Sequence, residues 1–546
     1  MKEWTLLSEP HFTKVSRGGD EIIEVLLANR GLKTKKEINE FLNPPSPYLL
    51  APGPLGIDQK ELTKAVKRIQ KAIKDKEKII IYGDYDTDGI CSTGILWQML
   101  YKSGANVLPH VPQRSEGYGL KSEKLEELQK SGVGLVITVD NGIVANEQVN
   151  FANKIGLDVI ICDHHQKGKV LPKAYAIVHT IKLAGAGVSW FLASRFGKPG
   201  LELVTIGTVS DMMPLIGPNR QIVKFGLEAL RKTKMPGLLS LYKVAGIDQA
   251  KIGTYEIGFL IGPRINAAGR MADPVEALRL VCTSDAKKAD DLATIMDRQN
   301  KERQVLTEEM RIHARDLWLS KDDKGKLIFV AHESYEEGVI GLVAGKLVEE
   351  FYRPTIVISR GVQYSKASAR SISGFNIIEA LRLYADLLGA HGGHPMAAGF
   401  TIATEKLGEL EKRLVELASE NIADDQLTPV LKIDLELPCN LFTYDFWQKI
   451  ADFEPFGIGN PEPVFLMRGM LVNNARLVGA TGSHLKLQVS GENGSIDAIG
   501  FGLGDRLPQL FPGKKVDLVF NLCADTWNGN KRIQLKLKDL KVADGN

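Results

Sequence analysis

The chain has 546 residues and a formal net charge of +3, with 44% apolar and 25% charged residues. This balance is ordinary for a soluble globular protein, and the length predicts three or four domains at roughly 100–200 residues each. A net charge this small cannot attract nucleic acid through the overall field of the protein. Any contacts with phosphates must therefore come from local basic patches.

The spacing of the cysteines and the length of the apolar runs indicate in which cellular compartment the protein works. The five cysteines are scattered without a CxxC pair, which disfavours a thiolate zinc site and is typical of a reducing environment. The first residues contain no apolar core of signal-peptide length, and the longest apolar runs are of strand length. We therefore predict a cytoplasmic protein that does not associate with membranes.

The first part of the chain predicts an α/β domain. Residues 1–50 are interpreted as a helical lead-in that ends in a proline-rich turn, and an amphipathic, Lys-rich helix follows over 60–78. Strand-length apolar runs at 78–82, 134–139 and 157–162 then alternate with helical segments. Continuously apolar strands alternating with helices favour a parallel sheet that is covered on both faces, here over residues 51–284.

Three further segments follow. Residues 285–319 lack Gly and Pro and predict a long charged connecting helix, which we extend to 285–325. Strands over 327–331 and 354–359, with a helix over 338–351, predict a smaller α/β module over 326–425. Short β-rich runs separated by Gly, Asn and Pro predict an antiparallel barrel or sandwich over 426–546.

Acidic and imidazole side chains follow four apolar runs of the first domain. These side chains are Asp84, Asp86 and Asp88 after 79–82, Asp140 after 135–139, Asp163, His164 and His165 after 159–162, and Asp211 after 204–209. Any one aspartate has even odds of being a turn or helix-cap residue. Such side chains recur at the same end of consecutive predicted strands, and this pattern instead predicts that they converge at one edge of the sheet.

Such a cluster predicts a metal site. Several carboxylates in one place repel each other, and their pKa values rise unless cations neutralise them. Carboxylates and imidazoles without thiolates suit Mn²⁺ or Mg²⁺ better than Zn²⁺. Two ions about 3.5–4 Å apart would stabilise both the attacking and the leaving oxygen of a phosphoryl displacement.

The motifs GDYDTDG, VDNG, DHH and TVSD resemble those of the DHH phosphoesterase superfamily. The resemblance implies that Asp86 and Asp88 bind different ions and that Asp140 bridges the two ions. His164 and Asp211 would complete the second site, and His165 would act on the substrate phosphate. By the same resemblance Asp84 is a first-site ligand or a neighbour of one, and Asp163 orients His164.

The second module carries two phosphate-binding candidates, SARS at 368–371 and HGGHPMAAG at 391–399. Consecutive glycines let backbone N–H groups approach a phosphate, although alone they are typical of a turn. The order of motifs resembles the DHHA1 substrate-binding domain with its GGHxxAAG pattern. That resemblance implies phosphate contacts from Ser368, Arg370, Ser371, Gly392, Gly393 and His394.

The segments IGPRINAAGR at 261–270 and PFGIGNPEP at 455–463 narrow the resemblance to the RecJ family. It implies that Arg114, Arg264 and Arg270, with Asn266, line the path of the 5′-terminal strand. It also implies a C-terminal OB barrel that binds single strands. For this barrel the candidate contacts are Phe501, Trp527, Lys531 and Arg532. The alternative is that the two aromatic rings fill the barrel core, and for Phe501 we favour that alternative.

The resemblance implies a 5′→3′ exonuclease specific for single-stranded DNA that releases 5′-mononucleotides in repair and recombination. A monomer working beside a single-strand-binding protein and a helicase is implied as well. Two alternatives stay open: a phosphodiesterase for short RNA oligonucleotides, and a non-catalytic single-strand-binding scaffold of replication.

Overall fold

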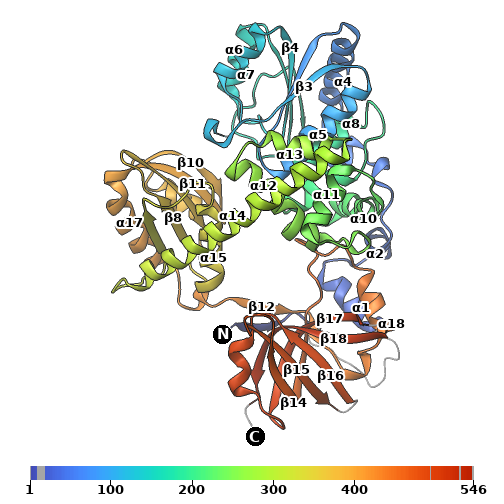
Figure 1. The fold of residues 1–546 in the computed structure, drawn as a ribbon, viewed down its shortest axis with the longest axis vertical. Coiled ribbons are helices and arrows are strands. Elements are labelled where there is room, and N and C mark those ends of the chain that lie inside the picture. The colour runs from blue at the N-terminus through green and yellow to red at the C-terminus, as the bar shows by residue number, and fades with distance from the viewer. Residues whose placement is uncertain (1, 9–18, 118, 492–493, 528–529, 544–546) are drawn as a thin grey trace.

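The computed structural model describes residues 2–8, 19–117, 119–491, 494–527 and 530–543. The elements form three units: the first is joined to the second by one long helix, and the third carries the C-terminal barrel (Figure 1). The predicted fold class, a parallel α/β domain with a smaller α/β module and an OB-type barrel, is confirmed. None of the helices that the structure describes has the length and apolarity needed to cross a membrane.

Five parallel strands form the sheet of the first unit in the order β3-β2-β4-β5-β6. They are β2 (Lys78–Tyr82), β3 (Asn106–His110), β4 (Val133–Val139), β5 (Asp158–Asp163) and β6 (Ala176–His179). Alternate side chains of β2 enter opposite cores, Ile79 and Ile81 on one face and Ile80 and Tyr82 on the other. Burial of both faces explains why β2, β4 and β5 are continuously apolar in sequence.

Helices cover both faces of this sheet (Figure 1). On one face lie α4 (Gln59–Lys74), α5 (Thr87–Lys102) and α8 (Gly185–Ala193), and on the other α6 (Ser122–Lys130) and α7 (Asn146–Lys154). The remaining helices of the unit are α3 (Pro52–Leu55), α9 (Glu202–Ser210), α10 (Gly217–Lys232), α11 (Pro236–Ala245), the π-helix η4 (Glu256–Ile261), α12 (Gly262–Met271) and α13 (Val275–Cys282).

One predicted strand is wrong. The apolar run 204–209 belongs to helix α9, so Asp211 follows a helix and not a strand. A short, fully buried apolar run does not distinguish strand from helix by its pattern. Because α9 packs against α5 and α8, it still delivers Asp211 to the same end of the sheet.

Helix α14 (Ala286–Leu319) connects the first unit to the second. Its 34 residues give a length of about 51 Å, and the Asp285 carboxylate caps it by accepting from the N–H groups of Lys287 and Lys288.

The second unit is a mixed sheet in the order β10-β11-β9-β8-β7, in which only β7 and β8 are parallel. Its strands are β7 (Ile328–His332), β8 (Thr355–Ser359), β9 (Tyr364–Arg370), β10 (Leu388–His394) and β11 (Ala397–Ala403), and its helices are α15 (Ile340–Phe351), α16 (Ile377–Arg382) and α17 (Leu407–Asn421). The glycine pair of HGGH lies within strand β10 and not in a turn, which is what such a pair alone is typical of.

The C-terminal unit is a barrel that the pairing of β14 with β17 closes. Its strands are β14 (Phe465–Val478), β15 (His484–Gly491), β16 (Gly494–Gly500), β17 (Lys515–Trp527) and β18 (Asn530–Val542), preceded by β12 (Val430–Ile433), β13 (Leu435–Glu436) and α18 (Tyr444–Ala451). The lead-in packs here: β1 (Glu3–Leu6) pairs with β12, and α1 (Asp20–Asn29) and α2 (Lys35–Leu42) bury Ile22, Leu26 and Phe41 against the barrel core.

A buried arginine joins the first unit to this C-terminal unit. Arg220 of α10, 1% exposed, donates to the carbonyl oxygens of Phe41 (2.7 Å), Phe453 (2.8 Å) and Glu454 (3.0 Å). Its guanidinium carbon lies 3.7 Å from the centroid of the Phe41 ring. Among the described residues no carboxylate forms an ion pair with Arg220, so backbone carbonyls and an aromatic face compensate its charge.

Candidate metal and phosphate site

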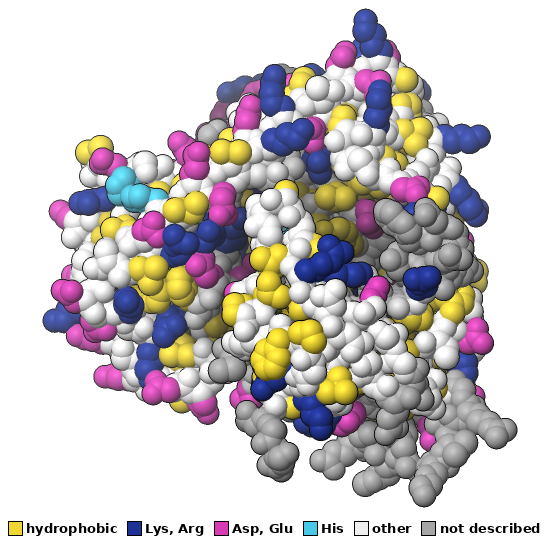
Figure 2. Space-filling model, turned by 60° about the horizontal axis from the view of Figure 1, so that its bottom comes forward, with side chains coloured by type: hydrophobic (Ala, Val, Ile, Leu, Met, Phe, Trp, Pro, Cys, Tyr) yellow, Lys and Arg dark blue, Asp and Glu magenta, His cyan; other side chains and the backbone are white. Residues whose placement is uncertain are grey.

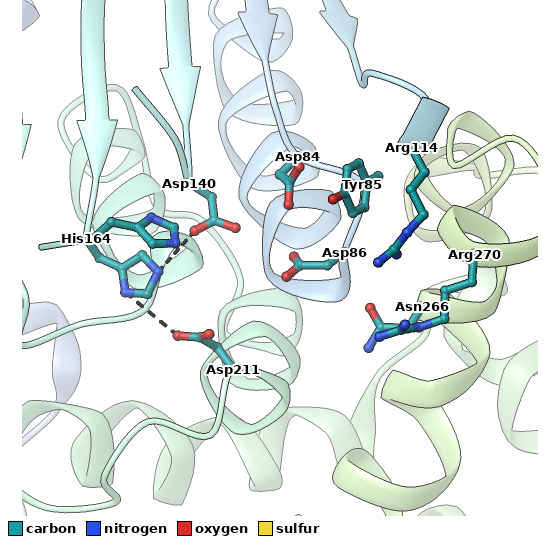
Figure 3. Close-up of a pocket in the computed structure, with 10 residues that line it drawn as sticks. Asp84, Tyr85, Asp86, Arg114, Asp140, His164, Asp211, Asn266 and Arg270 are labelled. Carbon is teal, nitrogen blue, oxygen red and sulfur yellow. Dashed lines mark ion pairs between the residues drawn. The ribbon is translucent and has the colours of Figure 1, made fainter. Parts of the chain in front are cut away.

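The carboxyl ends of β2, β4 and β5 meet where the strand order reverses. From β2 the chain runs outward to β3 on one side and returns to β4 on the other, which opens a crevice at these ends. Asp84 follows β2, Asp140 follows β4, and His164 follows β5 (Figure 3). The Asp86 carboxylate caps α5 by accepting from the N–H of Gly89 at 2.9 Å, which directs it into the same crevice.

Three overlapping groups of side chains have ligand atoms within 4.8 Å of one another. They are Asp84, Asp86 and Asp140; Asp88, His164 and Asp211; and Asp140, His164 and His165. His164 Nε2 lies 3.1 Å from Asp140 Oδ1, and His164 Nδ1 lies 3.7 Å from Asp211 Oδ2. Each of the six predicted metal-ligand residues thus belongs to one of these groups, and Asp140 and His164 each belong to two.

Asp88 is held by two backbone N–H groups. Its Oδ2 accepts from the N–H of Gly185 at 2.7 Å and its Oδ1 from the N–H of Ala186 at 2.9 Å, at the N-terminus of α8. The partial positive charge of that helix end stabilises the carboxylate. A Cβ on Gly207 would lie 2.5 Å from Asp88 Oδ1, so glycine is needed there for α9 to approach.

Asp140 has a backbone conformation that is uncommon for its residue type. Its φ of 63° lies in the left-handed region, where a residue other than glycine is strained. A Cβ on Gly185 would lie 2.5 Å from Asp140 Oδ1, so this glycine also makes room for the carboxylate. The local fold places this side chain at an energetic cost, as is common at functional sites.

The acidic groups have raised pKa values. Burial, with repulsion from Asp86, raises the pKa of Asp84 to about 8 and that of Asp211 to about 7. The same causes raise the pKa values of Asp88 and Asp140 well above the ordinary range. Asp84 Oδ1 is buried without a hydrogen-bond partner among the described residues. Oxygen ligands of this kind fit a hard divalent cation.

The two histidines differ. Burial, followed by the neighbouring His165, lowers the pKa of His164 to about 4, which keeps its ring neutral as a metal ligand requires. Burial lowers the pKa of His165 too, but its 2.7 Å contact with Asp163 and the nearby carboxylates outweigh burial, so the net shift is upward. Asp163 therefore orients the ring of His165. From His164 it accepts the backbone N–H at 2.7 Å, and among the described contacts it does not hold the His164 ring, contrary to our expectation.

Nine of the predicted residues line a cavity of about 260 Å³ together with Tyr85, which sequence reasoning missed. Beside the acidic cluster are Arg114, Asn266 and Arg270 (Figure 3). The Arg114 guanidinium lies 5.2 Å from the centroid of the Tyr85 ring, and Asn266 accepts from the N–H of Thr87 at 2.8 Å. Burial and the nearby Arg114 lower the pKa of Arg270 to about 10, which leaves it charged at neutral pH.

A second cavity of about 710 Å³ continues from the first, since Tyr85, Arg114 and Arg270 line both. Arg270 bridges the units by donating to Gly338 O at 2.8 Å. Predicted residues of the second unit in this lining are Ser368, Arg370 and Gly392.

Two further basic side chains were missed in this cavity. Lys366 alternates with Ser368 and Arg370 along β9 and so shares their face, a strand periodicity that could have revealed it. His391, rather than His394, lines the cavity.

Four predicted phosphate contacts lie outside both linings. Arg264 is buried and pairs with Asp297 of α14, with Nη2 2.9 Å from Oδ1. The Ser371 hydroxyl donates to Phe375 O at 2.6 Å. Gly393 permits close strand contact, because a Cβ there would lie 2.3 Å from Ala397 O, and His394 ends β10.

In the barrel, Phe501 is 59% exposed, so its expected place in the core is wrong. Arg532 is exposed, whereas the side chains of Trp527 and Lys531 lie outside the described residues. Over the face in Figure 2, Lys and Arg are interspersed with Asp and Glu, and basic side chains gather where the lobe at the left meets the rest of the molecule. The charge distribution agrees with the low net charge: positive charge is local.

Family models match three segments: the DHH family N-terminal domain over 78–208, the DHHA1 domain over 324–420, and the RecJ OB domain over 433–539. The single-stranded-DNA-specific exonuclease RecJ of Bacillus subtilis is 36% identical over 541 residues, 96% of this chain and 68% of that protein.

RecJ from Thermus thermophilus, solved with Mn²⁺, matches with a TM-score of 0.84 at 31% identity and covers 100% of this chain and 80% of that chain. The Mg²⁺ complex of the same protein gives a TM-score of 0.78 at 29% identity, with coverage of 100% and 79%. The chain therefore belongs to the RecJ family of exonucleases.

Proposed function

We propose that this protein is a single-stranded-DNA-specific exonuclease that degrades its substrate from the 5′ end and releases 5′-mononucleotides. The observation that carries the proposal is the convergence of acidic and imidazole side chains from four segments on a cavity that opens onto a basic face. Carboxylates to hold cations and arginines to hold phosphates are what hydrolysis of a phosphodiester needs.

We propose two divalent ions, Mn²⁺ or Mg²⁺. Asp84, Asp86 and Asp140 would hold one, and Asp88, His164 and Asp211 the other, with Asp140 Oδ1 close enough to His164 to serve both. When bound, such ions supply a nucleophilic water at neutral pH and neutralise charge on the phosphate.

The remaining steps belong to side chains of this chain. Arg114, Arg270 and Arg370 bind and orient the phosphates along the continuous lining of the two cavities. His165, held by Asp163 and partly exposed to the cavity, faces the substrate and donates a hydrogen bond to the phosphate or a proton to the leaving oxygen. Roles in repair and recombination, and cooperation with a helicase and a single-strand-binding protein, stay predictions.

The test is digestion of a 5′-labelled single strand and of the same sequence as a blunt duplex, with Mn²⁺ and with Mg²⁺. We expect labelled mononucleotide as the first product from the single strand and a much slower reaction of the duplex. Equal rates, or first release of a 3′ label, would contradict the proposal. Binding of Mn²⁺ measured by calorimetry should give two ions per chain, and one or none would contradict the assignment of ligands.

A further inference from the structure

Two aromatic rings stack on each other on the solvent side of the helix that carries Asn266 and Arg270. The ring centroids of Tyr255 and Phe259 are 4.9 Å apart, with an angle of 26° between the planes. Tyr255 is 60% exposed and Phe259 67% exposed. Single exposed aromatics are common, but the pair offers a continuous aromatic surface that the core of the protein does not use.

The pair belongs to the same helix face as two residues of the catalytic cavity. The π-helix η4 runs directly into α12, and along this run the isoleucines at 257, 261 and 265 are fully buried. The more accessible positions include Tyr255, Phe259, Pro263, Asn266 and Arg270, whose spacing of three or four residues defines one stripe. At a rise of roughly 1.5 Å per residue, Phe259 is about 10 Å along the helix from Asn266.

The opposite end of the stripe meets the segment that leads into the barrel. Thr254 Oγ1 donates to Phe456 O at 2.7 Å, and Leu215 N–H donates to Ile458 O at 2.6 Å. The two segments joined by this second contact carry exposed apolar side chains of their own, Met212 and Ile458. Along the helix the aromatic pair therefore lies between the cavity residues Asn266 and Arg270 and the contact with the segment that enters the barrel.

We propose that Tyr255 and Phe259 form a platform on which unpaired bases of the substrate strand stack just outside the catalytic cavity. This inference rests on the proposed function. Stacking tolerates any base, because every base has a π face, and it suits an enzyme that must move along a strand. A paired duplex offers no free base faces inside its helix, so the platform also favours single strands.

The test compares binding and turnover of an oligodeoxynucleotide by the Tyr255→Ala/Phe259→Ala variant and the unchanged protein. We expect Kd and KM to rise about tenfold for each ring removed, while kcat at saturation changes much less. Phe259→Trp should bind as tightly as the unchanged protein. Phe259→Leu keeps an apolar side chain without a π face and should bind as weakly as Phe259→Ala. The matched control is Tyr101→Ala: Tyr101 is 63% exposed and stacks on Trp97, with centroids 5.5 Å apart, at the other end of α5 from Asp86. This control should leave Kd and KM unchanged.

Abasic substitutions locate the bases that stack. In a series of oligonucleotides, two successive bases are removed at positions that move stepwise from the 5′ end. Removal at one of these positions should weaken binding to the unchanged protein and cause no further loss of binding to the double variant. Full affinity of the double variant, or of Phe259→Leu, would overturn the proposal. A dimer of the unchanged protein that the double variant loses in sedimentation, with the same Kd for DNA in both proteins, would also overturn the proposal, because the rings would then join two copies of the chain. Measuring Kd in an Asp140→Asn background separates the platform from catalysis, because ring-dependent binding can hold even where hydrolysis fails.

Discussion

The cavity lined by the acidic cluster and the joint at Arg220 both bury charge, but they neutralise it differently. At the joint, backbone carbonyls and the Phe41 ring surround the guanidinium, so its charge is compensated within the chain. In the cavity, carboxylates face other carboxylates, and their raised pKa values record that the chain does not fully compensate them. A buried charge that protein groups compensate has a structural role, as at Arg220. Buried charges that the protein compensates only in part indicate a binding site for a ligand of opposite charge.

The largest expected effect comes from removing one charge in the cavity. Asp140→Asn should lower nuclease activity by more than about 100-fold, since even outer partners of metal ligands cost 10–100-fold. The same change should leave the melting temperature of the metal-free protein equal or higher, because it removes repulsion from Asp88 and Asp86. Activity assays in Mn²⁺ and thermal melts in EDTA measure the two effects. Activity within tenfold of the unchanged protein would remove the carboxylate cluster from the mechanism.

At the joint we expect a loss of stability, which is not expected for the change in the cavity. Arg220→Met should lower the free energy of unfolding by at least about 3 kcal/mol, because several buried carbonyls each lose a donor at about 1–3 kcal/mol. Its control is Arg298→Met on α14, where an exposed ion pair is worth at most about 1 kcal/mol. Urea unfolding and amide hydrogen exchange at residues 452–454 measure the loss. If both variants unfold at the same urea concentration, the joint contributes no more than a surface charge.

The sequence predicts the cavity better than it predicts the joint, for a physical reason. The predicted metal-ligand residues follow apolar runs that end at one edge of a parallel sheet, so their position in the chain implies their position in space. This holds even for Asp211, whose preceding run is a helix. Arg220 contacts residues about 180 and 230 positions away, and nothing in its local pattern distinguishes it from a surface arginine of an amphipathic helix.

Three other features show where local patterns in the sequence fail: a pair of arginines, two strands and one lysine. Arg264 and Arg270 stand in one motif, yet the helix periodicity turns the first toward Asp297 and the second into the cavity. Strands β3 and β6, which contain NVLPH and AIVH, are too short or too polar to stand out as apolar runs. Alternation along β9 would have found Lys366, had the strand itself been predicted.

A smaller effect is expected from pH in the absence of metal. The pKa values of Asp84 and Asp211, about 8 and about 7 in the folded protein, lie above the value of about 3.9 for an unfolded aspartate. Between about pH 4 and pH 8 the folded chain holds protons that the unfolded chain releases, so the stability of the metal-free protein falls as pH rises. Bound Mn²⁺ needs deprotonated ligands, so the rise in melting temperature on adding Mn²⁺ should grow from pH 5 to pH 8.

That pH dependence can be checked by melting the protein in EDTA and in Mn²⁺ across this range. Asp84→Asn should flatten the slope in EDTA, whereas Arg220→Met should keep it, because Arg220 stays protonated throughout. A stability in EDTA that rises steadily from pH 5 to pH 8 would contradict the raised pKa values.

Exposed charge should have the smallest effect of all. Lys366 lies on the basic face of the second cavity, pairs with Glu337 at 2.7 Å, and keeps 56% of its side chain exposed. Water and salt screen such a charge, so Lys366→Ala should raise KM for single-stranded DNA only a few-fold and reduce the slope of log Kd against log salt by about 1. Stability should not change beyond about 0.5 kcal/mol. If the salt slope does not change, no phosphate of the strand contacts Lys366, and the strand passes by Arg370 and Arg270 without it.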